Sequence, residues 1–244
     1  MNVLGVILAR AGSVGLKDKH LRTILGKPVI QYTIDHALSA KTLTHIVVTS
    51  DSPDVLKLAQ KSELDIIHRP ASLATSDATV QDVVLHAMQT VEAQSDFRAD
   101  TVVTLYGNVA VRPAGVIDRA VELLEETGCD SVRSVVSVGK WHPTWMMKLN
   151  GDALELLTPN SVHRRQELQG LYLHEGAVVA VSRASMERAL QFPSDPHAFF
   201  GVDRRGFLTQ PDETVEIDHL RDLYWAEAVL RERGAEVKTW RAAS

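Results

Sequence analysis

The chain has 244 residues, of which 45% are hydrophobic and 23% are charged, and its formal net charge at pH 7 is -5. This composition is typical of one globular domain over residues 1–244, and the negative charge argues against a nucleic-acid partner. No apolar run approaches the ~20 residues of a membrane span and the only cysteine is Cys129, so we expect a cytoplasmic protein with no membrane partner.

Strands and helices alternate through the first half of the chain. The run "VLGVIL", residues 3–8, is continuously apolar, as in a strand that is buried on both faces. The segment 26–40 has helical spacing, with Pro28 in its first turn. Further strands are expected at 45–50, 64–70, 100–107 and 130–136, and further helices at 52–62, 79–94 and 114–128. This alternation predicts an α/β fold with a mainly parallel sheet and helices on both faces.

The alternation breaks between residues 139 and 172. The stretch "KWHPTWMMKLNGDALELLTPN" predicts two strands joined at an Asn-Gly turn. This stretch contains Trp141, Trp145 and Met146. Together they would expose more apolar surface than a projecting hairpin normally does. Either a partner subunit covers them or they pack on their own domain. A strand at 176–182 and a long C-terminal helix within 214–234 complete the predicted elements.

The loop after the first strand reads "LARAGSVGLKDKH". Gly12 and Gly15 leave room for phosphate to approach backbone N–H groups, and Arg10, Lys17 and Lys19 supply positive charge around them. Neither the P-loop pattern nor the dinucleotide fingerprint is present. The loop therefore suits a small polyanion, although a tight turn with solvated charges would also fit the pattern.

Taken together, these segments resemble the cytidylyltransferases that activate nonulosonic acids, a family typified by acylneuraminate cytidylyltransferases. The resemblance rests, in family order, on "ARAGSVGLKDKHL", "GKPVIQYTIDHAL", "IVVTSD", "HRPASLATSDAT", "HRRQELQGLYLHEGAVVAVSR" and "ETVEIDHLRDLYWAE". The chain departs from the family pattern at Val14, His20, Glu175 and Glu216, and has "YGNVAVR" where sialic acid enzymes have Q-P-T-S-P-L-R. The resemblance implies a Rossmann-like nucleotidyltransferase fold and a single domain that dimerises through the 139–172 excursion.

The reaction implied by the resemblance is transfer of CMP from CTP to a small acidic sugar, with release of pyrophosphate. Arg10 and Lys19 would grip the triphosphate, and Gly12, Ser13 and Gly15 would cradle it with backbone groups. Lys17 could replace the family lysine that is missing at position 14. Arg69 would lie near the nucleotide or hold the loop before Leu73 through backbone carbonyls.

Glu216 and Asp218 are two residues apart on a strand-like segment, so both carboxylates lie on one face, where they can share a hard cation. Magnesium is the expected cofactor, and Asp218 is also expected to be catalytic. The competing interpretation is that these acids cap the helix that begins near His219.

The sugar acid is expected to meet Arg165 and Gln166, because a guanidinium group fits a carboxylate, with Tyr106 and Asn108 lining the sugar pocket. Two alternatives stay open. The chain could act on another sugar acid or a sugar phosphate, including 3-deoxy-manno-octulosonate, pseudaminate or legionaminate. It could also be a non-catalytic nucleotide-binding relative.

Overall fold

The centre of the molecule is a seven-stranded sheet with the strand order β12-β8-β11-β6-β1-β4-β5. The structure is a computed structural model that describes residues 1–12 and 15–234. In this sheet β11 is antiparallel to both of its neighbours, and all other pairs are parallel, so six strands run in one direction. The prediction of a mainly parallel α/β sheet is confirmed. The strands are β1 (Val3–Leu8), β4 (His45–Ser50), β5 (Asp65–His68), β6 (Thr101–Tyr106), β8 (Ser131–Ser137), β11 (Tyr172–Ser182) and β12 (Arg204–Leu208).

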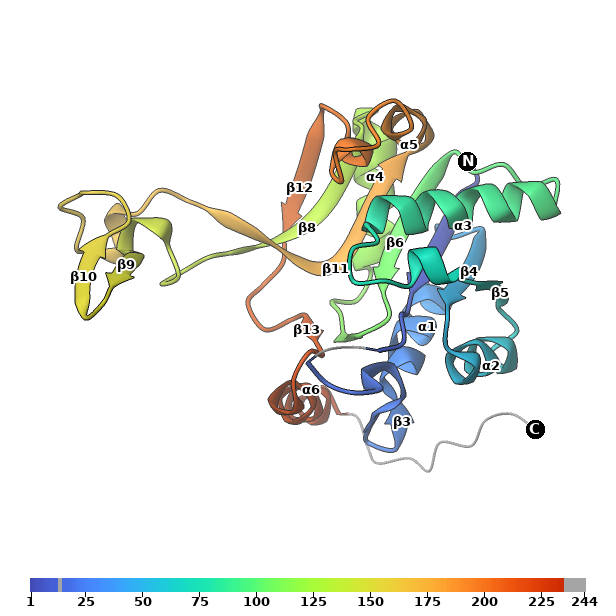
Figure 1. The fold of residues 1–244 in the computed structure, drawn as a ribbon, viewed down its shortest axis with the longest axis horizontal. Helices are drawn as coiled ribbons and strands as arrows, with labels where there is room; N and C mark the ends of the chain where they lie inside the picture. Colours follow the sequence, from blue (N-terminus) through green and yellow to red (C-terminus); the bar gives the residue numbers. More distant parts are fainter. Residues whose placement is uncertain (13–14, 235–244) are drawn as a thin grey trace.

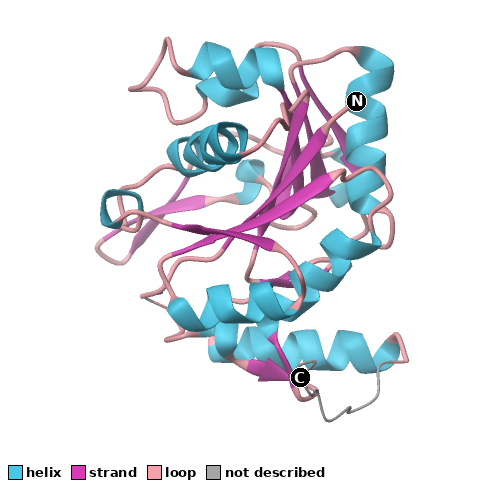
Figure 2. Cartoon of the chain, turned by 90° about the vertical axis from the view of Figure 1, so that its right-hand side faces the viewer, coloured by secondary structure: helices cyan, strands magenta, loops and turns pink. Residues whose placement is uncertain are grey.

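Helices cover both faces of this sheet (Figure 2). One face packs against α1 (Val29–Ser39), α2 (Pro53–Lys61) and α4 (Val116–Thr127). The other packs against α3 (Val80–Gln94) and α5 (Arg183–Ala189). The predicted start of α2 is confirmed, because the Ser52 hydroxyl accepts a hydrogen bond from the Val55 N–H. Short 3-10 turns complete the helical elements: η1 (Lys19–Leu21), η2 (Ala71–Leu73), η3 (Pro143–Trp145), η4 (Arg165–Glu167) and η5 (Ala198–Phe200).

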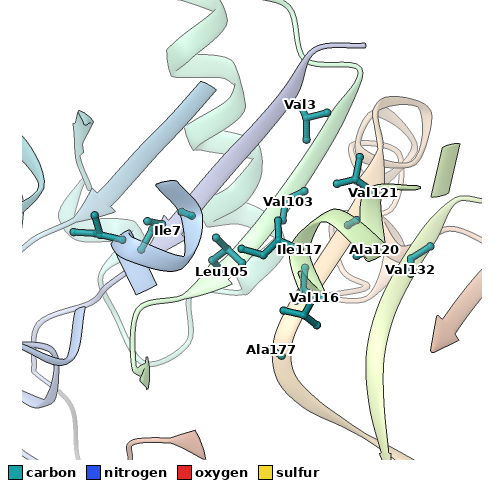
Figure 3. Close-up of a cluster of buried hydrophobic side chains, with 14 of the residues drawn as sticks. Val3, Ile7, Val103, Leu105, Val116, Ile117, Ala120, Val121, Val132 and Ala177 are labelled. Carbon is teal, nitrogen blue, oxygen red and sulfur yellow. The ribbon is translucent and has the colours of Figure 1, made fainter. Parts of the chain in front are cut away.

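Strand β1 is buried on both faces, as its apolar run predicts. Val3 and Ile7 belong to the cluster that faces α1 and α4 (Figure 3), whereas Leu4 and Val6 belong to the cluster that faces α3. Burying each of these side chains contributes about 1.5–3 kcal/mol. The strand that carries the glycine-rich loop is therefore fixed from both sides.

A smaller layer joins the C-terminal part of the chain to the first loop. Strand β7 (Val109–Val111) pairs with β13 (Val215–Glu216), and β2 (Thr23–Ile24) pairs with β3 (Lys27–Pro28). Helix α6 (Leu220–Glu232) closes this layer, with Ile24, Ile217 and Ala226 in a third buried cluster. As a result, α6 and β13 lie beside the loop that follows β1 (Figure 1).

Residues 139–172, called the arm below, extend away from the body of the molecule (Figure 1). Strand β8 leads into the arm and β11 returns from it, while β9 (Met147–Asn150) and β10 (Ala153–Leu156) form its hairpin. The indole N–H of Trp145 donates to the Val162 carbonyl within the arm. Trp141, however, is 71% exposed and Leu149 is 70% exposed. The described residues of the body therefore leave Trp141 and Leu149 uncovered.

The pattern did not predict the short strands β2, β3 and β7, nor α5 and β12. Strand β11 also begins at Tyr172 rather than near 176, and it passes through an irregularity between His174 and Val179. Pro28 directly precedes α1 instead of lying in its first turn. Among the described residues, no helix has both the length and the apolar character required to cross a membrane.

Candidate active site

A cavity of about 540 Å³ opens at the carboxyl ends of β1 and β6, where a parallel sheet is expected to gather its ligand-binding loops. Its walls come from the loop after β1, the segment after β5, the loop after β6 and the turn before α6. The lining residues are Leu8, Arg10, Gly15, Leu16, Lys19, His20, Arg69, Leu73, Thr75, Ser76, Ala78, Thr79, Val80, Val83, Tyr106, Asn108, Glu216, Asp218 and His219.

Three cationic side chains line this cavity: Arg10, Lys19 and Arg69. Arg69 is buried and donates from Nη2 to the Thr49 carbonyl at 2.9 Å. Burial, partly offset by Asp51, lowers the pKa of Arg69 to about 10, so it stays charged at neutral pH. Arg69 thus lies in the cavity, and the backbone carbonyl that it holds belongs to Thr49 in β4 and not to the loop before Leu73.

The start of the glycine-rich loop is tied to the next strand by a residue that the motif does not include. Asp51, directly after β4, accepts a hydrogen bond from the Ala11 N–H at 2.7 Å. Gly12 has a φ of 68°, which favours glycine, but it does not line the cavity. Ser13 and Val14 lie outside the described residues.

Gly15 has a role that the phosphate interpretation did not include. A Cβ atom added at Gly15 would lie 2.5 Å from the backbone oxygen of Asp218. Real Cβ atoms do not approach a backbone oxygen this closely, so the loop can meet the turn before α6 only with glycine at this position. The absence of a side chain at Gly15 therefore allows the glycine-rich loop to pack directly against the backbone at Asp218.

Glu216 and Asp218 both line the cavity, and Asn108 links them. The Asn108 amide donates from Nδ2 to Glu216 Oε1 at 3.0 Å, to the Ile217 carbonyl at 3.2 Å and to Asp218 Oδ1 at 3.2 Å. Asp218 also accepts a hydrogen bond from Lys19 Nζ at 2.7 Å. The sequence prediction that both carboxylates face one site is therefore consistent with the geometry.

The competing interpretation, in which these acids cap α6, does not agree with the hydrogen bonds. The carboxylate that caps this helix is Asp222, which accepts from the backbone N–H groups of Asp218 and His219. These bonds help to lower the pKa of Asp222, although its partial burial opposes them. Because Asp222 performs the capping, the Asp218 side chain is left to face the cavity.

Tyr106 and Asn108 come together in the cavity as predicted. Burial is the main cause that raises the pKa of Tyr106, and the negative charge of Glu216 adds to it, so its hydroxyl is a proton donor at neutral pH. Tyr106 is the last residue of β6, and Asn108 lies in the turn between β6 and β7, where its amide contacts both carboxylates.

His20 is a buried cavity residue between Lys19 and Arg69. Its burial, together with these two positive charges, lowers its pKa to about 3. The imidazole is therefore neutral at physiological pH. In the sequence His20 is a departure from the family pattern, and its neutrality depends on burial that the motif does not show.

Arg165 and Gln166 are not part of this cavity. Both belong to η4 in the arm, and neither lines the cavity of its own chain. The structure thus brings together the predicted residues Arg10, Gly15, Lys19, Arg69, Tyr106, Asn108, Glu216 and Asp218, and it places the predicted sugar-carboxylate residues elsewhere. It also adds Thr75, Ser76, Thr79 and His219, which no sequence pattern indicated.

Known proteins resemble this chain over most of its length. The family described as "Cytidylyltransferase" matches residues 4–229. The chain is similar to an N-acylneuraminate cytidylyltransferase of Streptococcus agalactiae serotype V, with 29% identity over 196 residues, which cover 79% of this chain and 46% of the relative. It is also similar to a CMP-N,N'-diacetyllegionaminic acid synthase of Legionella pneumophila subsp. pneumophila, with 33% identity over 222 residues, which cover 89% of this chain and 91% of the relative.

The chain spans about half the length of the first three curated relatives that it matches. Among solved structures, it resembles a CMP:2-keto-3-deoxy-manno-octonic acid synthetase complexed with CTP, with a TM-score of 0.72 and 20% sequence identity. That match covers 96% of this chain and 100% of the other. At this identity the likeness shows a shared fold.

Proposed function

Because the chain belongs to the cytidylyltransferase family, we propose that it transfers CMP from CTP to a nonulosonic, sialic-acid-like sugar acid and releases pyrophosphate. The family match supports the nucleotide half of this proposal. The relatives named for sialic and legionaminic acids support the sugar half. One observation of this structure supports both: a single cavity is lined by three cations and by two carboxylates that Asn108 links.

In this reaction the anomeric hydroxyl of the sugar attacks the α-phosphorus of CTP. The new bond joins the sugar oxygen to phosphorus, the bond to the bridging oxygen breaks, and pyrophosphate leaves with the electron pair of that bond. The hydroxyl proton passes to solvent or to a neighbouring base. Negative charge grows on the leaving phosphates, so correctly placed cations supply much of the rate enhancement.

Arg10 and Lys19 are proposed to contact the triphosphate. Lys19 is bonded to Asp218 in the structure, so its ammonium group would move from this carboxylate to a phosphate oxygen when CTP binds. Arg69 stays in place, because its guanidinium is anchored on the Thr49 carbonyl. The planar guanidinium of Arg10 offers several N–H donors to one phosphate.

The carboxylate pair fits a magnesium ion in its chemistry. Magnesium is usually bound by one or two carboxylates together with substrate phosphates, and it keeps several waters. Glu216 and Asp218 would hold it, while Asn108 keeps the two carboxylates together. Consistent with a site completed by substrate, the described residues contain no group of three or more His, Cys, Asp or Glu side chains suited to a metal. When bound, the ion would neutralise charge on the phosphates.

The sugar carboxylate needs a cation, and among the described residues Lys19, which could supply one, is already paired with Asp218. Arg165 and Gln166 could meet this need only in a cavity other than that of their own chain. We therefore propose a homodimer in which the arm of one copy approaches the cavity of its partner. Trp141 and Leu149, both about 70% exposed, would be covered in such an assembly.

The test is pyrophosphate release from CTP and magnesium with a panel of acidic sugars: N-acetylneuraminate, its deaminated analogue, legionaminate, pseudaminate and 3-deoxy-manno-octulosonate. We expect release with a nonulosonic acid, and we expect Asp218→Ala to abolish it. Asp203→Ala is the matched control, because Asp203 is also a half-exposed, ion-paired aspartate but lies beside β12, outside the cavity.

Release with 3-deoxy-manno-octulosonate alone would replace the nonulosonic acid by that sugar. CTP binding without release for any sugar would contradict the proposal and favour a non-catalytic nucleotide-binding relative.

A further inference from the structure

Arg112 is a buried cation without a carboxylate partner. The residue is 1% exposed, and among the described residues it takes part in no ion pair. Burial is the main cause that lowers the pKa of Arg112 to about 9, and the more distant charges of Glu175 and Glu216 oppose this. Removing a guanidinium from water without a counterion is costly unless its N–H groups are satisfied.

Backbone carbonyls satisfy it instead. The Arg112 guanidinium donates to the Tyr106 carbonyl at 2.8 Å, the Val109 carbonyl at 2.7 Å and the Ala177 carbonyl at 2.8 Å. A fourth bond, at 2.9 Å, goes to the hydroxyl of Thr33 in α1. Arg112 therefore ties together β6, β7, β11 and α1 at the rear of the cavity.

Two of these carbonyls flank the turn that enters the cavity. Gly107 and Asn108 are the only residues between Tyr106 and Val109. Because the carbonyls on both sides of the turn are fixed, the backbone of Asn108 has little freedom. Thr33 reinforces the same turn, because its single hydroxyl proton lies within reach of both carbonyls, at oxygen–oxygen distances of 3.2 Å to Tyr106 and 3.0 Å to Val109.

Asn108 in turn holds the carboxylate pair. Its side chain is buried and donates to both Glu216 and Asp218, and its backbone oxygen accepts from the Ile217 N–H at 2.8 Å. A continuous set of hydrogen bonds therefore runs from Arg112, through the turn, to the two carboxylates. Arg112 itself does not line the cavity.

We propose that Arg112 is a positioning residue: its guanidinium fixes the turn between Tyr106 and Val109 so that Asn108 holds Glu216 and Asp218 together for one shared ligand. This inference rests on the proposed function for its catalytic meaning. Its structural part concerns residues of this chain alone and can be tested without any substrate.

The first test is hydrogen exchange of the free protein. The variant Arg112→Lys keeps the charge, but one ammonium group cannot span three separated carbonyls and the Thr33 hydroxyl. We expect amide exchange to rise about tenfold or more in segments 106–111 and 214–218, relative to the rest of the chain. A uniform rise across the whole chain, or no local rise, would overturn the proposal.

Arg183→Lys is the matched control. Arg183 is also a largely buried arginine that donates to a carbonyl, that of Ala99, but it lies at the opposite end of the sheet and pairs with Glu92. Its variant should loosen its own surroundings and leave 214–218 unchanged. If Arg112→Lys does not fold, Thr33→Val removes the second support of the same turn while preserving volume and charge, and a smaller rise in the same two segments is expected.

The second test is a double-mutant cycle with Asn108→Ala, measured by calorimetric binding of CTP with magnesium and by the magnesium concentration that half-saturates pyrophosphate release. Arg112→Lys and Asn108→Ala should each weaken binding about tenfold, and the double variant should be little worse than either one. Arg183→Lys combined with Asn108→Ala should show no such coupling.

Binding by Arg112→Lys equal to that of the wild type, or additive effects in the cycle, would assign Arg112 a structural role only and overturn the proposal. If the wild type neither binds CTP nor releases pyrophosphate, the proposed function fails, and the hydrogen-exchange result still decides whether Arg112 positions the carboxylate pair.

Discussion

Lys19 and Asp218, which are 199 residues apart in the chain, form a 2.7 Å ion pair across the mouth of the cavity. Lys19 belongs to the element that follows the glycine-rich loop, and Asp218 belongs to the turn before α6. The residue expected to grip phosphate thus neutralises the residue expected to hold the metal. In the free protein, the cation proposed to bind phosphate and the carboxylate proposed to bind the metal ion therefore neutralise each other.

Replacing Lys19 by methionine tests this relationship. A charge-assisted hydrogen bond to a phosphate contributes about 1.5–3 kcal/mol, so we expect the KM for CTP to rise about 10-fold to 100-fold. Stability should change by at most about 1 kcal/mol, because the Asp218 side chain is 50% exposed and solvent screens the pair. Steady-state kinetics and urea unfolding measure the two effects.

Lys17→Met is the control for that variant. Lys17 is exposed and does not line the cavity, so its loss should change the KM less than about threefold, the range of a weak surface charge effect. An equal loss in both variants would mean that Lys17 replaces the lysine missing at position 14 and that Lys19 has no special role.

Gly15→Ala should separate the loop from the turn before α6. The new Cβ would lie 2.5 Å from the Asp218 oxygen, so backbone must move on one side. We expect the affinity for CTP with magnesium, measured by calorimetry, to fall about tenfold or more, because active sites are sensitive to displacements of about 1 Å.

Gly128→Ala is the control. Its φ of 64° is strained for alanine, but no atom lies within 4 Å of the added Cβ and the residue lies outside the cavity. It should lower stability and leave CTP affinity unchanged. Unchanged affinity in Gly15→Ala would contradict the close contact.

His20 should make the protein sensitive to mild acid. The pKa of His20 is about 3 in the folded state and 6.5 in the unfolded chain. Between these two pH values the unfolded chain therefore binds a proton at His20 that the native state does not bind. Stability is therefore lost as the pH falls through the window from 6.5 toward 3. Between pH 7 and pH 5 this one residue should account for about 2 kcal/mol of the loss. Urea unfolding of wild type and His20→Asn at both pH values measures it.

The variant should lose less stability than the wild type on acidification. His163→Asn, an exposed position in the arm, should behave like the wild type. An identical pH dependence for His20→Asn and wild type would show that this imidazole is protonated in the folded state.

The proposed dimer predicts a change in mass when the arm loses its apolar surface. Trp141→Ser combined with Leu149→Ser should convert dimers to monomers in sedimentation velocity experiments. Trp141 is a better probe than Trp145, whose indole N–H is bonded within the arm. Val202→Ser removes an equally exposed apolar residue, 71% accessible, outside the arm and should leave the mass unchanged. A wild type that sediments as a monomer would rule the dimer out.

The sequence predicts the sheet and its main helices well because those segments are long and strongly patterned. Strand β1 is apolar on both faces, and α2 begins at a serine that caps it. The missed elements give weaker signals. Strand β12 has one buried residue, Phe207, in five, and β7 has only three residues. Helix α5 spans less than two full turns, so its periodicity is short.

The cavity was predictable where a residue contributes its own charge, as for Arg10, Lys19 and Asp218. It was not predictable where a residue acts through backbone atoms. Arg112 contacts three backbone carbonyls. Every residue has such a carbonyl, so the amino-acid sequence does not reveal which ones are contacted. The place of Arg165 depends on how far the arm extends, and local patterns near residue 165 do not encode that distance. Gly15 was predicted as a loop glycine, but its contact with Asp218 joins residues about two hundred positions apart.

Strand β11, the antiparallel strand of the seven-stranded sheet, runs from the arm to the neighbourhood of the cavity. Strand β11 leaves the arm at Tyr172 and reaches Gly176 four residues later, a path of about 13 Å. At Gly176 a Cβ atom would already contact Glu216 Oε2 at 3.6 Å and Tyr106 at 3.8 Å. The irregularity between His174 and Val179 lies on this path. A change in the angle of the arm can therefore reach the neighbourhood of Glu216 through the backbone of β11, because no loop separates the arm from Gly176.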